Sequence, residues 1–366
     1  MKKNKNQVCF VLALALALAL ALLPGCHRKP AGIQTLDLAE LAASEFRTDW
    51  TMDEVVRPAA CFELAPDRPL GYARMAGFDG KNLLLSVGDS VLFAGPDGKI
   101  VSAFSHKGNG PQEYLRNEPY FDPEGRVLVL DLMKRRALTY LQDGTFVSAL
   151  EDLDYVDIHF FPDGSRVVMA RPDFAKETSR TFSVLGPDGK VRSSGPERSS
   201  REMFMAVKPG LFTAAADGSC WLIYAEQDTL YRIRPEGAEA VAAFVRPTKS
   251  TGGEQQSTDG SFFLQQDLSR FMDRNCLVLG DLMYYSFNDR EQHVEHYLVL
   301  DLRNGACLYH GLVAPLLHLD AQAVHVWPVY ANGRDAWCQL PRKAATAMLP
   351  DYDDDSNDAF VHLVSR

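Results

Sequence analysis

The chain has 366 residues, of which 46% are hydrophobic and 23% charged, and its formal net charge at pH 7 is −10. This length is sufficient for one large hydrophobic core. The acidic balance argues against nucleic acids and anionic lipid headgroups as partners, because both repel a negatively charged surface.

The N-terminus carries the pattern of an export signal. Three of the first five residues are lysines, and the apolar run 8–23 that follows has 16 residues, fewer than the roughly 20 that a transmembrane helix needs. The segment Leu22-Leu23-Pro24-Gly25-Cys26 resembles a bacterial lipobox. The resemblance implies that residues 1–25 are a lipoprotein signal peptide and that Cys26 becomes acylated, which would hold the protein on a membrane. A plain secreted protein and an uncleaved anchor are the alternatives.

Residues 26–49 are predicted to be a linker and a short lead segment, ahead of one β-domain over residues 50–366. The only clear helical pattern lies in Leu36–Glu45, where Asp37 is placed to cap the first turn.

Two interleaved series of glycines organise the β-domain. Their spacing is close to 45 residues, the length of one four-stranded propeller blade. The first series is Gly80, Gly125, Gly164, Gly218, Gly280 and Gly333, and the second is Gly98, Gly144, Gly189, Gly237 and Gly305.

Short β-rich runs follow each glycine of the first series, and each run is predicted to be a buried inner strand. The second series lies in predicted hairpin turns, two of which share the sequence Gly-Pro-Asp-Gly-Lys. Six repeats predict an all-β, six-bladed β-propeller of four-stranded antiparallel blades. We expect Phe62–Leu64 and Phe360–Leu363 to lie in the same blade and close the ring. A β-sandwich with a second β-domain is the alternative.

The segment Lys107-Gly108-Asn109-Gly110-Pro111-Gln112-Glu113-Tyr114 is the sharpest local motif. We treat Lys107, Gly108, Gly110, Pro111, Glu113 and Tyr114 as a candidate binding loop. In the structural alternative, Glu113 accepts backbone N–H bonds and Tyr114 packs between blades. A second candidate contact segment is the polar stretch 246–267, which lengthens one repeat by about 20 residues; a surface loop without a binding role is its alternative.

No metal site or cofactor is predicted. Asp351, Asp353, Asp355 and Asn357 alternate as in a calcium loop, but glycine and glutamate are missing from the positions where such a loop needs them. The chain also contains no Gly-x-Ser-x-Gly and no His-Glu-x-x-His, so no catalytic residue is assigned.

Several motifs together resemble the six-bladed β-propeller lipoproteins of Bacteroidetes. They are Ser44-Glu45-Phe46, Gly108-x-Gly110-Pro111-x-Glu113-Tyr114, Asp228-Thr229-Leu230-Tyr231-Arg232-Ile233 and Ser356-Asn357. The resemblance covers nearly all of residues 33–366 and implies an exported propeller, lipid-anchored in the cell envelope. The basic residues after Cys26 favour the periplasmic face of the outer membrane.

Three functions follow from these observations. The favoured one is a non-catalytic recognition module that binds a glycan, a peptide or an envelope protein. One alternative is a divalent-metal-dependent hydrolase or lactonase with its site in the central channel. The other is a structural partner of an outer-membrane uptake complex.

Overall fold

The computed structural model describes residues 34–173, 175–199, 212–222, 229–245, 271–320, 322–353 and 355–366. The predicted signal peptide 1–25, the predicted acylation site Cys26 and the candidate contact segment 246–267 lie outside these residues. Residues 35–366 form one compact unit, which is the part described below. Within the described part of the chain, no helix is both long enough and apolar enough to cross a membrane.

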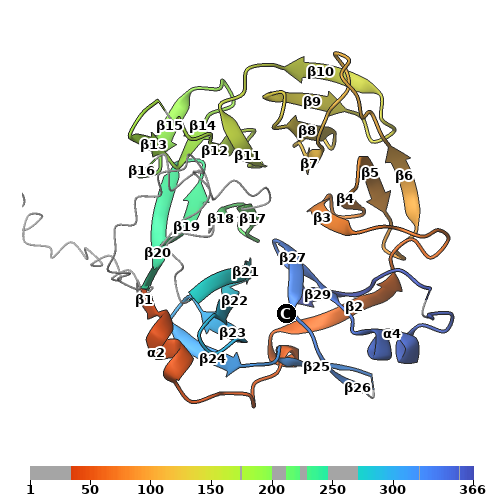
Figure 1. The fold of residues 1–366 in the computed structure, drawn as a ribbon, viewed down its shortest axis with the longest axis vertical. Helices are drawn as coiled ribbons and strands as arrows, with labels where there is room; N and C mark the ends of the chain where they lie inside the picture. Colours follow the sequence, from red (N-terminus) through yellow and green to blue (C-terminus); the bar gives the residue numbers. More distant parts are fainter. Residues whose placement is uncertain are drawn as a thin grey trace, which may run out of the picture. The chain divides into compact units, whose positions relative to one another are not determined.

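Six antiparallel sheets surround a common centre in this unit (Figure 1). Blades 1 to 3 consist of β3 (Ala73–Phe78), β4 (Leu83–Val87), β5 (Ser90–Ala94) and β6 (Ile100–Phe104); β7 (Glu118–Phe121), β8 (Val127–Asp131), β9 (Arg136–Tyr140) and β10 (Phe146–Leu150); and β11 (Tyr155–Phe160), β12 (Arg166–Ala170), β14 (Phe182–Leu185) and β15 (Val191–Ser194). Blades 4 to 6 consist of β17 (Phe212–Ala214), β18 (Cys220–Leu222), β19 (Thr229–Arg234) and β20 (Gly237–Val245); β21 (Phe271–Leu279), β22 (Leu282–Asp289), β23 (Val294–Asp301) and β24 (Ala306–Gly311); and β27 (Pro328–Asn332), β28 (Asp335–Gln339), β29 (Ala359–Ser365) and β2 (Val56–Glu63). The predicted six-bladed propeller is confirmed.

The remaining elements decorate the ring. They are β1 (Gln34–Asp37), α2 (Leu38–Ala43), the 3-10 turn η1 (Met52–Glu54), the pair β13 (Thr178–Arg180) and β16 (Glu197–Ser199), the hairpin β25 (Leu316–Leu319) and β26 (Gln322–His325), and α4 (Arg342–Met348). The predicted cap of α2 is confirmed, because the Asp37 carboxylate accepts the N–H groups of Ala39 and Glu40. Helix α4 was not predicted: it has seven residues and no side-chain cap, and it buries Ala344 and Ala345 in the core.

The glycines of both series have φ between 61° and 92°, as tight turns require, except Gly237, which begins β20 with a nearly extended φ of 159°. The first series lies in the turns between the first and second strands of a blade, and the second series lies in the turns between the third and fourth strands.

The predicted position of the inner strands was wrong. The β-rich runs after the first series are the second strands of their blades, and the strand just before each run is the innermost one (Figure 1). The second strands are mostly buried, as are third strands such as β5 and β9, because strands in the middle of a blade have a neighbouring strand on both sides.

The two ends of the β-domain close the ring in blade 6. Strand β2 pairs with β29 in the same blade, as predicted, in a register that the structure shows to put Phe62 opposite Phe360. Asn357 reinforces this closure: its side chain accepts the N–H of Leu70 at 2.7 Å and donates to the carbonyl oxygens of Ala65 and Arg68. Part of the acidic segment before the last strand therefore has a structural role.

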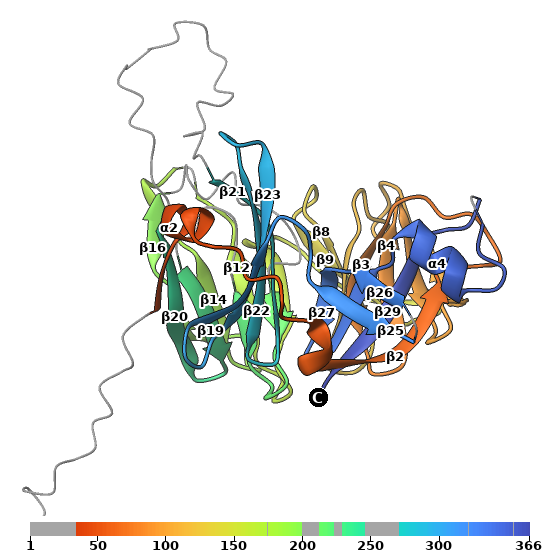
Figure 2. The ribbon, with the colours of Figure 1, turned by 90° about the horizontal axis from the view of Figure 1, so that it is seen from below.

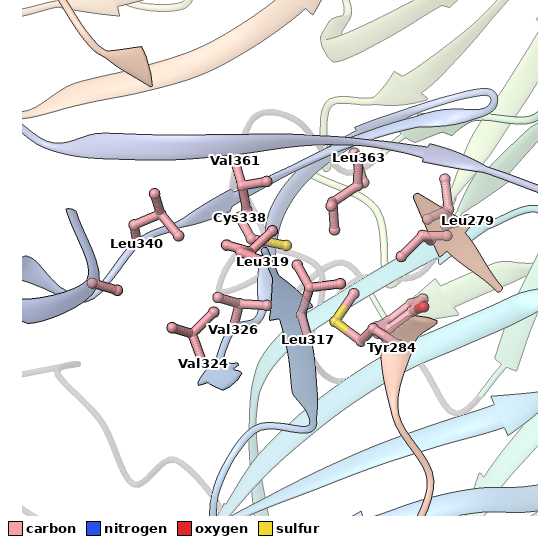
Figure 3. Close-up of a cluster of buried hydrophobic side chains, with 14 of the residues drawn as sticks. Leu279, Tyr284, Leu317, Leu319, Val324, Val326, Cys338, Leu340, Val361 and Leu363 are labelled. Atoms are coloured by element: carbon pink, nitrogen blue, oxygen red, sulfur yellow. The ribbon is translucent and has the colours of Figure 1, made fainter. Parts of the chain in front are cut away.

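Apolar side chains fill the spaces between neighbouring blades. Leu84 and Phe93 of blade 1 pack with Val129 and Leu138 of blade 2, for example. The largest such cluster joins blades 5 and 6 and includes the hairpin β25–β26 (Figure 3). Burial on both faces explains why sheets of four or five strands are stable in this arrangement.

Candidate functional site

Charged and phenolic side chains gather on the innermost strands of four blades and the connection before β7. We call this group the inner-strand cluster. Its members are Arg74, Arg116, Glu118, Tyr120, Asp157 and Tyr330.

Glu118 is the centre of the inner-strand cluster. It is the first residue of β7, and its side chain is only 4% exposed. Arg74 of β3 donates to one of its oxygens through Nη2 at 2.5 Å, and Arg116 donates to the other through Nε at 3.1 Å. The Arg74 side chain is 30% exposed and that of Arg116 60% exposed. A buried carboxylate therefore holds two guanidinium groups that both still reach solvent, and the bond from Arg74 links blade 1 to blade 2.

Two tyrosines extend the cluster to blades 3 and 6. Burial raises the pKa of Tyr120 well above its usual value, and the nearby carboxylates of Asp157 and Glu118 raise it further. Burial also raises the pKa of Tyr330, whereas the positive charge of Arg74 acts in the opposite direction. Both hydroxyls therefore keep their protons at neutral pH. Asp157 is fully buried, and its carboxylate accepts the N–H of Ile158 at 2.8 Å.

His159 lies two residues beyond Asp157 on β11 and has an apolar environment. Its ring contacts Phe161 and Phe212, with centroid distances of 5.4 and 6.4 Å. Burial lowers the pKa of His159 to about 4, so the imidazole is neutral at pH 7.

The candidate binding loop 107–114 lies between β6 and β7, directly before Arg116 and Glu118. The Glu113 carboxylate accepts the N–H of Gly110 at 2.8 Å. Tyr114 is fully buried, and its hydroxyl donates to the Asp89 carbonyl oxygen at 3.0 Å. Gly108 has no room for a side chain, because a Cβ there would overlap the Glu113 carboxylate. These contacts are the ones that the structural alternative describes.

Side chains of blade 2 donate hydrogen bonds to the backbone carbonyl oxygens of the same loop. Lys134 donates to the Gly108 carbonyl oxygen at 2.8 Å, Arg136 donates to the carbonyl oxygens of Gly110, Pro111 and Glu113, and Tyr140 donates to that of Gln112 at 2.7 Å. At the loop's start, Lys107 forms an exposed ion pair with Asp89 at 2.7 Å. The loop backbone is therefore rigid, and it positions the segment that carries Arg116 and Glu118. Contact between the loop and a ligand remains a prediction.

Analysis of the sequence missed the inner-strand cluster. Its members lie on, or just before, the strands that come ahead of the β-rich runs, whereas the sequence pattern predicts those runs themselves as the inner strands. The available signal was a charged residue near the start of a segment that ends at a first-series glycine, as in Arg74 before Gly80 and Glu118 before Gly125. Correct strand order within the blade would have directed attention to these residues.

Three further kinds of side chain could carry chemistry: possible metal ligands, the cysteines and a pair of histidines. Among the described residues, no group of three or more His, Cys, Asp or Glu side chains is arranged to hold a metal ion. Cys220 and Cys338 are fully buried, and burial raises the pKa of both thiols. The Nδ1 atom of His296 lies 3.0 Å from Nε2 of His310 in a buried pair, a partner that sequence spacing did not reveal.

Known proteins resemble this chain in fold. No protein-family profile matches it, and none of the curated proteins compared with it has a significantly similar sequence. Among solved structures, a proposed exported protein of Bacteroides fragilis is similar with a TM-score of 0.61 and 12% identity, over 91% of this chain and 99% of the other. A member of the DUF4221 family from Bacteroides vulgatus has a TM-score of 0.49 and 9% identity, over 85% and 98% of the two chains. At such identities the likeness shows the fold alone.

Proposed function

We propose that this protein is an exported, lipid-anchored recognition module that binds a carboxylate-bearing glycan or peptide at the inner-strand cluster. The lipobox-like segment ending at Cys26 supports export and anchoring. The fold similarity to a proposed exported protein of Bacteroides fragilis agrees with this location.

The exposed guanidinium of Arg116 is the observation that carries the proposal. Glu118 engages it through Nε, and the fork geometry of arginine leaves the Nη groups for a second acceptor. A carboxylate is a planar acceptor that matches such a fork. The buried Glu118 fixes the position of Arg116 before a ligand arrives, which reduces the entropy lost on binding.

Exposed hydrophobic side chains lie within two residues of these arginines in the sequence. Tyr72, directly before β3, is 85% exposed, and Leu115, directly before Arg116, is 39% exposed. Tyrosine combined with arginine is typical of binding surfaces, and an exposed ring can stack on a sugar or pack on a peptide. The acidic surface elsewhere keeps the module soluble, while the arginines supply local attraction for a carboxylate.

The test is a thermal-shift screen of the mature chain against acidic oligosaccharides and acidic peptides, each paired with its neutral counterpart. We expect an acidic ligand at 100 times its Kd to stabilise the protein by about 2.7 kcal/mol. The variant Arg116→Gln should weaken that ligand by roughly 10- to 100-fold, the value of a charged hydrogen bond.

Arg303→Gln is the matched control. Arg303 is also an exposed arginine that donates to a buried carboxylate, with an Nη2 distance of 2.7 Å to Asp301, but it lies in the turn between β23 and β24. This variant should bind the ligand like the wild type. Equal affinity in the wild type and the Arg116 variant, or no preference for the acidic member of any pair, would contradict the proposal.

A further inference from the structure

The hairpin β25–β26 has one buried and one exposed face. Leu317, Leu319 and Val324 point into the core beside Val361 and Leu363 of blade 6 (Figure 3). Figure 2 shows the same hairpin beside β2 and β29. Because side chains alternate along a strand, the residues between these apolar ones face solvent.

Two histidines lie on the exposed face. His318 is opposite Ala323 in the hairpin register, and His325 is opposite Leu316. His318 and His325 are therefore diagonal neighbours on the same side of the two strands, at a spacing of roughly 7–8 Å between backbones, within reach of long side chains. Both residues are exposed. The packed opposite face holds the strands that carry them.

Each imidazole is oriented through its Nδ1 atom. Nδ1 of His318 lies 2.7 Å from the Asp53 carboxylate, which also accepts the backbone N–H of His318 at 3.1 Å. Nδ1 of His325 lies 2.6 Å from the Ala314 carbonyl oxygen. Carbonyl and carboxylate oxygens only accept hydrogen bonds, so the proton lies on Nδ1 in both neutral rings. The lone pair of each neutral ring is then on Nε2.

This arrangement is the one that metal-binding histidines have. A ligating histidine commonly donates its second ring N–H to a carboxylate or a backbone carbonyl, which sets the tautomer and the ring orientation. Here one ring has a carboxylate partner and the other a carbonyl partner. Such partners are not needed by solvated surface histidines, yet both members of this pair have them.

We propose that His318 and His325 form a surface site for one Zn²⁺ or Cu²⁺ ion, bound through the two Nε2 atoms, with water in the remaining positions. Imidazole nitrogen suits these ions, whereas Ca²⁺ and Mg²⁺ prefer oxygen ligands. Asp53 acts as a positioning residue that holds His318. This site is independent of the inner-strand cluster and of the recognition function proposed for it.

Isothermal titration of the mature chain with Zn²⁺, together with electron paramagnetic resonance of the Cu²⁺ complex, tests this proposal. We expect one ion per chain and a Cu²⁺ spectrum with hyperfine coupling to two imidazole nitrogens. The variants His318→Gln and His325→Gln should each abolish the two-nitrogen spectrum and weaken Zn²⁺ by at least about tenfold. Asp53→Asn should retain both nitrogens but weaken Zn²⁺ by roughly 10- to 100-fold, the usual effect of losing such a partner.

His293→Gln is the control, because His293 is an exposed histidine in the turn before β23. It should bind like the wild type, and unchanged thermal unfolding of all four variants would show that they are folded. The absence of stoichiometric binding, or equal binding by the His318 and His325 variants and the wild type, would overturn the proposal.

Discussion

Replacing His159 should change how the stability of this protein depends on pH. In the folded protein the pKa of His159 is about 4, whereas an unfolded histidine has a pKa near 6.5. Between these values the unfolded chain binds a proton that the folded protein does not. Stability is therefore lost progressively as the pH falls from about 6.5 to about 4, and both states are protonated below that range.

The size of the effect follows from the same pKa values. At 1.36 kcal/mol per pH unit, the difference corresponds to roughly 3 kcal/mol. The His159 side chain is not completely buried, so some solvation of the charged form reduces this value. We expect the wild type to lose about 2–3 kcal/mol more than a variant without this titration.

The assay is urea unfolding at pH 7, 5.5 and 4 for the wild type, His159→Phe and His159→Gln. Phenylalanine keeps the ring contacts with Phe161 and Phe212, and glutamine keeps polarity without a titrating proton. Relative to the wild type, both variants should have a shallower decline in the free energy of unfolding below pH 6.5. Replacing the exposed His293 by glutamine should leave the decline unchanged. Parallel curves for the wild type and both His159 variants would refute the burial argument.

Three stability predictions can be checked by the same unfolding measurement. Gly125→Ala should lower the free energy of unfolding by about 1–2 kcal/mol, because it adds only a Cβ at positive φ in open space. Gly98→Ala should cost clearly more, because its Cβ would overlap the Glu63 carbonyl oxygen. Equal losses in the two variants would contradict this explanation of the turns. Asp37→Ala should cost about 1 kcal/mol through loss of the α2 cap, and a result near zero would mean that α2 is held by packing alone. Leu317→Ala should cost about 2–5 kcal/mol, since this side chain is fully buried between the β25–β26 hairpin and blade 6. A loss below about 1 kcal/mol would argue against that packing.

The blade number and the ring closure could be predicted from the sequence because both depend on local features. Positive φ at a tight turn favours glycine on local grounds, so Gly80 and its counterparts mark each blade. Phe62 and Phe360 were identifiable as spare strand residues at the two ends of a repeat, and a closed ring has one place for them. The Asp37 cap is local in the same way.

The position of each strand within its blade and the composition of the candidate sites depended on long-range contacts. Most inner strands are short or only partly apolar, so their hydrophobic pattern is weaker than that of the second strands. Glu118 meets Arg74 only because blades 1 and 2 pack side by side, and the two residues are 44 positions apart in a sequence that carries no signal of this pairing.

The sequence alone determined the architecture, since turn chemistry and the repeat length are properties of neighbouring residues. Tertiary structure decided which charges meet at the centre of the ring and which histidines share a face of the β25–β26 hairpin. Asp53 orients His318 from 265 residues away, a contact that exists only because η1 packs against β25. Such contacts depend on how separate elements are placed in space, which no local pattern encodes.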